Sequence, residues 1–242
     1  MRKFGLLGKS LEHSFSKRFF TSKFEAEGID ATYENVEIAE IAGVTEVFSN
    51  ADWSGMNVTT PYKEAVIPFL DELSEEAEAI GAVNTIVFAE GKKIGHNTDA
   101  FGFAQSIKPF LTNKHERALI PGTGGASKAV AYVFKNLGID AIFVSGNPEG
   151  LKEFPYDAIN EHMLRACKVV VNCTPVGTYP DVHETVPFAF EYLTYEHLVI
   201  DLIYNPEKTL FLQKAEENGA SILNGASMLK EQALKAWEIW TK

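Results

Sequence analysis

Cysteine, positive charge and long apolar stretches are all scarce in this sequence of 242 residues. Its two cysteines, Cys167 and Cys173, are too few for a disulfide framework and lack the spacing of metal ligands, which indicates buried thiols in a reducing, cytoplasmic location. The formal charge of -11 excludes a general attraction to nucleic acid or to an anionic membrane surface. An anionic ligand must therefore be held by a few local donors.

The apolar run from Phe4 to Leu7 is far too short for a signal sequence or a membrane span, so we interpret it as part of a first β-strand. The six histidines are scattered, and no pair has the spacing that places two metal ligands on one helix face. We therefore expect no metal. With 45% hydrophobic and 23% charged residues, the composition is that of a globular protein with one large domain or two modest ones.

The first hundred residues alternate between strand and helix patterns. We predict strands at residues 4–8, 32–38 and 55–58, with helices at about 15–27 and 39–49 between them. Gly28 is placed to end the first of these helices. Residues 84–98 have the pattern of a hairpin that turns at Glu90, Gly91 and Lys92. This block predicts a mostly parallel sheet covered by helices, with one antiparallel edge.

A second alternating block begins near Arg117. Strands are predicted at residues 118–121, 139–144, 168–173 and 197–201. The helix after the first of these has one apolar face, formed by Ala126, Ala129, Val130, Val133, Phe134 and Leu137. Residues 99–110 are predicted to form a helix between the blocks, and residues 226–242 a final helix. The helical pattern is weak between Gly150 and Met163, so this block is expected to be shortened there.

A glycine-rich turn lies between the first strand and first helix of the second block. It consists of Gly122, Thr123, Gly124, Gly125, Ala126 and Ser127. Glycines here allow close approach to a pyrophosphate, and the helix start offers free N–H groups, so this context favours dinucleotide binding over a plain turn. Ser127 replaces the third glycine of the usual pattern. The next strand ends at Ser145, Gly146 and Asn147, which supply neither the carboxylate typical of NAD sites nor the arginine typical of NADP sites.

Four polar residues of the first block, Ser14, Ser16, Lys63 and Asp99, allow both a structural and a functional interpretation. Ser14 and Ser16 stand at a helix start, where one serine is most simply an N-cap, although two hydroxyls could also hold a small carboxylate. Lys63 could be an ordinary solvated charge, but the helix dipole disfavours lysine at a helix start. Asp99 could be another cap. Because such clusters follow several strands, where open α/β sheets bind ligands, we favour a binding site.

The motifs taken together resemble the shikimate dehydrogenase family. They are GKSLEHSFS, NVTTPYKE, GAVNT, HNTDA, GTGGAS, NCTPVG, DLIYNPEKT and the run from Gly225 to Gln232. The resemblance covers nearly the whole chain in family order. It implies a two-domain α/β fold, with a substrate-binding catalytic domain formed by residues 1–100 and 225–242, and a Rossmann-like NAD(P)-binding domain formed by residues 101–224. The C-terminal helix would return to the first domain.

The resemblance also implies roles for individual residues. Lys63 and Asp99 would form the catalytic pair. The substrate would be held by Ser14, Ser16, Thr59, Asn84, Tyr204 and Gln232. The cofactor would lie against Gly122, Thr123, Gly124, Gly125, Ala126, Ser127, Thr174, Leu202, Gly225 and Met228, with Ser145 and Asn147 at the adenosine end. When hydride reaches a ketone carbon, negative charge develops on its oxygen, and an ammonium group such as that of Lys63 can stabilise this charge and supply a proton.

The implied activity is that of an oxidoreductase, the reversible NADPH-dependent reduction of 3-dehydroshikimate to shikimate on the chorismate route to aromatic amino acids. Three positions depart from the family pattern. Ser10 replaces a proline, Ala100 replaces a glycine, and Gly146 replaces the arginine that clamps the 2′-phosphate of NADP. Because this arginine is missing, NAD is a possible cofactor as well as NADP. Alternatives are a quinate/shikimate dehydrogenase that uses NAD, or a non-catalytic ligand-sensing homologue. We expect a small-molecule ligand, no nucleic acid or membrane partner, and a monomer or homodimer.

Overall fold

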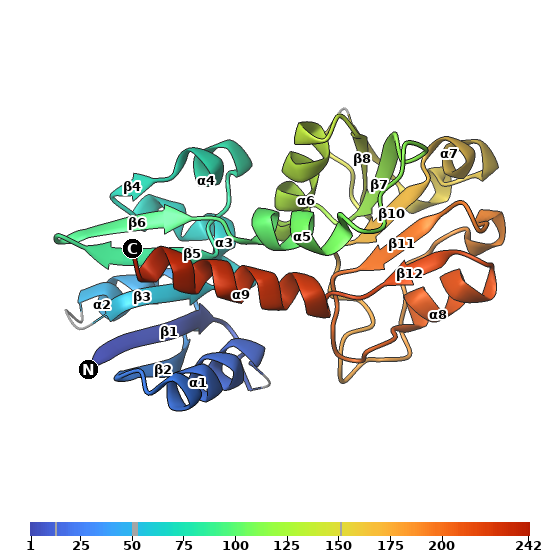
Figure 1. Cartoon of the computed structure of the whole chain (residues 1–242). Coiled ribbons are helices and arrows are strands. Elements are labelled where there is room, and N and C mark those ends of the chain that lie inside the picture. The colour runs from blue at the N-terminus through green and yellow to red at the C-terminus, as the bar shows by residue number, and fades with distance from the viewer. Residues whose placement is uncertain (13, 50–52, 151) are drawn as a thin grey trace. The chain divides into compact units, whose positions relative to one another are not determined.

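The structure is a computed structural model that describes residues 1–12, 14–49, 53–150 and 152–242 (Figure 1). It contains two compact units, the first formed by Met1–Thr98 with Gln232–Lys242, and the second by Asp99–Glu231. The final helix, α9 (Ala226–Trp240), contributes residues to both units, with the division at Gln232, and the domain bounds 1–100 with 225–242 and 101–224 stay a prediction.

The first unit is built on a six-stranded sheet with the order β2-β1-β3-β5-β6-β4. Its strands are β1 (Arg2–Gly8), β2 (Ala31–Glu37), β3 (Trp53–Val58), β4 (Glu72–Leu73), β5 (Thr85–Ala89) and β6 (Lys92–His96). β1 is parallel to both β2 and β3, whereas β5 is antiparallel to β3 and β6. Glu90 and Gly91 have φ angles of 52° and 75° between β5 and β6, which confirms the predicted hairpin turn.

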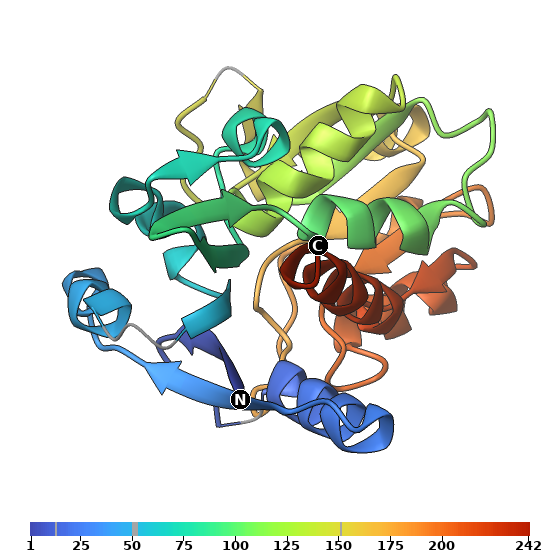
Figure 2. The same ribbon diagram turned by 60° about the vertical axis from the view of Figure 1, so that its left-hand side comes forward.

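Helices cover both faces of this sheet. They are α1 (Phe15–Glu27), α2 (Val44–Ser49), α3 (Tyr62–Ala65) and α4 (Glu75–Ile80), with single 3₁₀ turns at Ile41–Gly43 and Ile67–Phe69. α1 and α9 pack on one face (Figure 2). There Phe20 and Trp240 join the cluster around Phe4. The other helices pack on the opposite face around Met56. The predicted helix at 39–49 therefore starts later than expected, because its first residues form the 3₁₀ turn.

The second unit contains a fully parallel six-stranded sheet with the order β12-β11-β10-β7-β8-β9. Its strands are β7 (Arg117–Pro121), β8 (Asp140–Val144), β9 (Glu153–Phe154), β10 (Val169–Asn172), β11 (Leu198–Asp201) and β12 (Ser221–Leu223). Numbered from β7 onward, this is the 3-2-1-4-5-6 order of dinucleotide-binding folds. β8 and β9 are added on one side of β7, and β10 to β12 are added on the other side. The order of strands therefore reverses between β7 and β10, and such folds bind their ligands at this position.

The helices of the second unit are α5 (Asp99–Ile107), α6 (Gly125–Asn136), α7 (Glu161–Ala166) and α8 (Leu210–Glu217), with 3₁₀ turns at Tyr156–Ala158 and Phe190–Tyr192. Ala129, Val130, Val133 and Phe134 of α6 are buried as predicted. Leu137 is 53% exposed, so its predicted place in the core is wrong. It caps the helix immediately before Gly138, whose φ of 74° turns the chain away from the core.

The shortening expected after Gly150 lies between β8 and β9. These parallel strands are joined by a short loop where other doubly wound folds have a helix, and the next helix, α7, has only six residues. In the described part of the chain, no helix has both the length and the apolar character required to cross a membrane.

Candidate active site

The start of α1 carries the first pair of predicted substrate residues. Ser14 is the N-cap, and its Oγ accepts a hydrogen bond from the backbone N–H of Lys17 at 3.2 Å. Ser16 lies in the first turn and is half-buried. The structural interpretation of Ser14 is therefore correct, and it leaves the hydroxyl proton of this serine available to a ligand, since the cap uses only a lone pair of the oxygen.

Lys63 lies in α3, a single helical turn that follows β3. Its side chain is half-buried, and its backbone carbonyl accepts a hydrogen bond from the N–H of Val83 at 2.7 Å. Thr59, at the end of β3, is also half-buried and donates its backbone N–H to the carbonyl of Leu7 at 2.9 Å. The predicted residues of the NVTTPYKE motif are thus fixed to β1 and to the segment before β5 through their backbone.

Asn84 is buried and occupies the centre of a polar cluster in the first unit. Its Nδ2 donates to Oγ1 of Thr98 and to Oε1 of Gln232, both at 3.0 Å. Its Oδ1 accepts from the backbone N–H of Thr98 at 2.7 Å. Asn84 and Gln232, which are 148 positions apart, are therefore brought together. Asp99 directly follows Thr98, starts α5 and is 1% exposed.

The predicted cofactor residues of the second unit follow the carboxyl ends of five parallel strands. Gly122 to Ser127 follow β7, Ser145 and Asn147 follow β8, Thr174 follows β10, Leu202 follows β11, and Gly225 and Met228 follow β12. Tyr204, a predicted substrate residue, also follows β11. Because parallel strands end at the same edge of a sheet, these residues share one edge, as ligand-binding residues of doubly wound folds do.

The glycine-rich turn has the conformation that the sequence pattern required. Gly122 has a φ of 104°, and a Cβ there would lie 3.1 Å from the backbone carbon of Cys173. Gly124 is the N-cap of α6, and a Cβ on it would meet nothing within 4 Å. Ser127 is buried and its hydroxyl donates to the carbonyl of Gly124 at 2.6 Å. Ser127 thus replaces the third glycine by closing the first turn of the helix.

Thr174 and Leu202 are held by a buried network that the sequence analysis did not single out. Thr174 donates its N–H and its hydroxyl to Oδ1 of Asn172, at 3.1 and 2.7 Å. Nδ2 of Asn172 donates to Oδ1 of Asp201 at 3.1 Å, and the hydroxyl of Thr209 donates to Oδ2 of Asp201 at 2.6 Å. Burial raises the pKa of Asp201 to about 6, although three hydrogen bonds act in the opposite direction.

Gly225 makes a backbone contact that only glycine permits. A Cβ at this position would overlap the carbonyl group of Leu202, and the N–H of Gly225 donates to the carbonyl of Ile203 at 3.1 Å. Met228 is buried one turn into α9, and Tyr204 is half-buried in the loop after β11. Predicted residues from the ends of β11 and β12 therefore lie against each other.

The loop after β8 is held by polar contacts among its own residues. The Oγ of Ser145 accepts the backbone N–H of Asn147 at 3.2 Å, and Nδ2 of Asn147 donates to Glu149 at 3.2 Å. Lys152, one candidate to replace the missing arginine, pairs instead with Asp140 at the amino end of β8. A Cβ on Gly146 would meet nothing within 4 Å, so the position is open.

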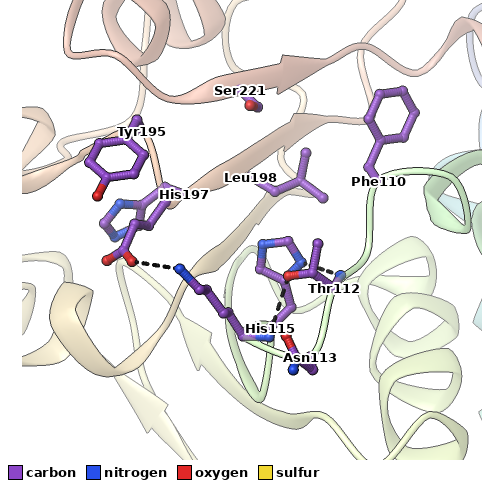
Figure 3. A pocket seen from close by; sticks show the side chains of 10 residues that line it. Phe110, Thr112, Asn113, His115, Tyr195, His197, Leu198 and Ser221 are labelled. Atoms are coloured by element: carbon purple, nitrogen blue, oxygen red, sulfur yellow. Dashed lines mark hydrogen bonds and ion pairs between the residues drawn. The ribbon is translucent and has the colours of Figure 1, made fainter.

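A pocket of about 400 Å³ lies at the opposite edge of the second sheet, at the amino ends of β7, β11 and β12 (Figure 3). Two of its lining residues, Lys114 and Glu196, form an ion pair with an Nζ–Oε1 distance of 3.2 Å. Nδ1 of His115 accepts the backbone N–H of Thr112 at 3.0 Å, and burial lowers the pKa of this histidine. None of the predicted site residues lines this pocket. Within the described residues, no group of three or more histidine, cysteine or acidic residues is arranged to hold a metal ion.

The sequence of this chain is similar to those of known proteins. Residues 6–86 match the model of the shikimate dehydrogenase substrate binding domain. Over 98% of its length the chain is 37% identical to the NADP(+) shikimate dehydrogenase of Desulforamulus reducens, of which it covers 89%. This chain belongs to the shikimate dehydrogenase family. The predicted family is therefore confirmed.

Solved structures of the family share the whole fold. A shikimate dehydrogenase crystallised in complex with NADP+ matches with a TM-score of 0.88 at 30% identity, over 100% of this chain and 90% of that chain. The enzyme of Thermus thermophilus, in complex with NADP(H) and shikimate, matches with a TM-score of 0.86 at 32% identity, over 100% of this chain and 94% of its own. These matches confirm the predicted two-sheet α/β fold class.

Proposed function

We propose that this chain catalyses the reversible NADPH-dependent reduction of 3-dehydroshikimate to shikimate, a step towards chorismate and the aromatic amino acids. The observation that carries the proposal is the presence of every motif of the catalytic and substrate-binding set in a chain that is 37% identical to an NADP(+) shikimate dehydrogenase over 98% of its length. The first unit would bind the substrate and the second the cofactor. The chain would act in the cytoplasm as a monomer or homodimer.

The first unit offers groups that suit a cyclic hydroxy acid. Ser14 and Ser16, at the N-terminus of a thirteen-residue helix, would bind the carboxylate through their hydroxyls and the helix dipole. Thr59, Asn84 and Gln232 would bind ring hydroxyls, and Tyr204 would lie against the substrate. The protein has a net charge of -11, so it does not attract anions in general. A local set of donors such as these serines is therefore needed to hold the carboxylate.

Lys63 and Asp99 would carry out the proton chemistry. As negative charge develops on the carbonyl oxygen of 3-dehydroshikimate, the Lys63 ammonium would stabilise it and donate a proton, so that the oxygen becomes the hydroxyl group of shikimate. Asp99 would bind the same hydroxyl and orient the lysine. In the reverse direction Lys63 would act as the base. Support comes from the backbone anchors, since Lys63 and Thr98 are hydrogen-bonded to consecutive residues, Val83 and Asn84.

The second unit fits a dinucleotide. The open space at Gly124 and the free N–H groups at the start of α6 suit a pyrophosphate, and Thr174, Leu202, Gly225 and Met228 would line the nicotinamide. When bound, NADPH supplies the hydride. The residues of the chain would hold the ring at one edge of the sheet and exclude water with the apolar side chains of Leu202 and Met228.

A spectrophotometric assay of nicotinamide reduction tests this function. The expected result is turnover of shikimate with NADP+, with a higher kcat/KM than for quinate with NAD. If quinate with NAD gives the higher value, the chain is instead a quinate/shikimate dehydrogenase, for which the open Gly146 position is the supporting observation. Calorimetric binding of shikimate without any hydride transfer at saturating cofactor would indicate a ligand sensor.

A further inference from the structure

A line of hydrogen bonds runs through the first unit from Tyr33 to Gln232. The hydroxyl of Tyr33 donates to Oδ1 of Asn57 at 2.8 Å, and Nδ2 of Asn57 donates to Oγ1 of Thr85 at 3.1 Å. The hydroxyl of Thr85 donates to Oδ1 of Asn84 at 3.2 Å, and Nδ2 of Asn84 donates to Oε1 of Gln232 at 3.0 Å. This line joins β2, β3 and α9 through the residues at the start of β5.

Two backbone groups fix the direction of every bond in this line. The N–H of Thr98 can only donate, and it faces Oδ1 of Asn84 at 2.7 Å. The carbonyl of Asn84 can only accept, and it faces Nδ2 of Asn57 at 3.2 Å. Oδ1 of Asn57 must therefore face Tyr33, which has to be the donor. The orientation of both amides follows from the network and not from an arbitrary assignment.

The sheet register explains how Tyr33 reaches a residue two strands away. Tyr33 is paired with Phe4 of β1, and Asn57 is paired with Leu6 of the same strand. Because Phe4 and Leu6 are two residues apart, all four side chains point to one face, and the Tyr33 ring passes over β1 to meet Asn57. The ring of Phe20 stacks on Tyr33 at a centroid distance of 4.8 Å and an angle of 14°. The hydroxyl is thus held in one position.

Burial keeps this hydroxyl protonated. Tyr33 is 4% exposed, and burial raises the pKa of its hydroxyl well above the usual value. The group is therefore a donor at neutral pH, and Oδ1 of Asn57 accepts its hydrogen bond. At the other end of the line, the carbonyl oxygen of Gln232 is occupied by Asn84, and Gln232 presents its NH₂ group as a donor.

We propose that Tyr33 is a positioning residue of the substrate site, which holds the side chains of Asn84 and Gln232 in place through Asn57 and Thr85. The inference rests on the proposed function, in which Asn84 and Gln232 bind the ring hydroxyls. Without the Tyr33 hydroxyl, Oδ1 of Asn57 is a buried acceptor with one donor fewer, and the Asn57 amide keeps its bonds to Asn84 and Thr85 but loses the bond that anchors its oxygen. The side chains of Thr85, Asn84 and Gln232, which follow Asn57 in the line, would then be held less firmly.

Tyr62 provides a matched control on the other face of the sheet. It is also 4% exposed, and its hydroxyl also makes a 2.8 Å hydrogen bond, but to the backbone carbonyl of Ile38. Replacing either tyrosine by phenylalanine removes one buried hydroxyl and its bond to Asn57 or Ile38, and in Tyr33→Phe the side chain of Ser16 also loses a hydrogen-bond partner. The two variants should therefore lose similar stability. A larger rise in the KM for shikimate in Tyr33→Phe would then come from the hydrogen bonds of Tyr33 and not from a general loss of stability.

The experiment measures kcat and the KM for shikimate at saturating NADP+, together with the melting temperature, for wild type, Tyr33→Phe and Tyr62→Phe. We expect the KM of Tyr33→Phe to rise about five- to tenfold with kcat changed less, as for the loss of one well-placed hydrogen bond. Tyr62→Phe should keep its KM within about twofold of wild type. Equal KM values for the two variants, at similar melting temperatures, would overturn the inference.

A double-mutant cycle separates positioning from a general loss of packing. If Tyr33 acts through Gln232, Tyr33→Phe should have little further effect on KM in a Gln232→Ala background. Fully multiplicative effects would overturn the inference while leaving the proposed function intact. A wild-type chain that neither turns over shikimate nor gains melting temperature in its presence would overturn the proposed function, and this inference with it.

Discussion

The buried carboxyl group of Asp201 should make the free energy of unfolding fall as pH rises, and the substitution Asp201→Asn should remove this dependence. The side chain is fully buried, and burial raises its pKa from 3.8 to about 6. Because the pKa in the folded state lies above that of the unfolded chain, the protonated acid is the favoured form in the fold. Its stabilising contribution is complete below about pH 4 and is lost as pH rises through about 6.

The size of the effect follows from the two pKa values. A difference of about two pH units, at about 1.36 kcal/mol each, corresponds to roughly 3 kcal/mol in the free energy of unfolding. Asp201→Asn should resemble the protonated acid. Its carbonyl oxygen can keep the bonds from Asn172 and from the N–H of Ile203, and its NH₂ group can donate to the hydroxyl of Thr209.

Urea unfolding of wild type and Asp201→Asn between about pH 4 and 7.5 measures this effect. The stability of the variant relative to wild type should increase by roughly 3 kcal/mol across that range, and other titrating groups cancel in the difference. Asp140→Asn is the surface control, because this exposed carboxylate forms an ion pair with the exposed Lys152 and its loss should change stability by less than about 1 kcal/mol. If the free energy of unfolding changes with pH by the same amount in wild type and in Asp201→Asn, the reasoning is refuted.

Three further changes test the proposed site. Lys63→Ala should lower kcat at least about a hundredfold with a smaller effect on KM, and a near-normal kcat in a steady-state assay would show that another group donates the proton. Gly146→Arg places a guanidinium at an open position, so the KM for NADP+ should fall by about tenfold while that for NAD does not; an unchanged ratio would contradict the missing clamp. Gly225→Ala would overlap the Leu202 carbonyl, so calorimetry should show a loss of roughly 3 kcal/mol or more in stability, and a normal melting temperature would mean that the strand end shifts freely.

Local sequence patterns predicted most of the elements because their causes are local. Ser14 and Gly28 bound α1 as an N-cap and a left-handed C-cap, and Glu90 and Gly91 form the hairpin turn. Where a local pattern failed, a neighbouring turn was responsible. Leu137 fits the apolar period of α6, but the left-handed Gly138 ends the helix at that residue and leaves the side chain in solvent.

The sequence could not identify the buried polar networks, because their members come from distant strands. Tyr33 and Asn57 are 24 positions apart, and Asn172 and Asp201 are 29 apart. Nothing in the spacing of such residues distinguishes a buried hydrogen-bond partner from an ordinary polar residue. The register of the parallel strands brings them together, and that register depends on all strands of the sheet at once.

The sequence alone determined the family, the strand and helix order, the glycine turn at Gly122 and the set of polar residues available for chemistry, because each depends on residues that lie close together in the chain. The tertiary structure decided which of those polar groups are held in place. It satisfies Asn84 through Thr98 and Gln232, buries Asp201 beneath three donors and permits only glycine at position 225. The physical reason is that a buried polar group must find its partners wherever the sheet places them, and the sheet brings together residues from across the chain.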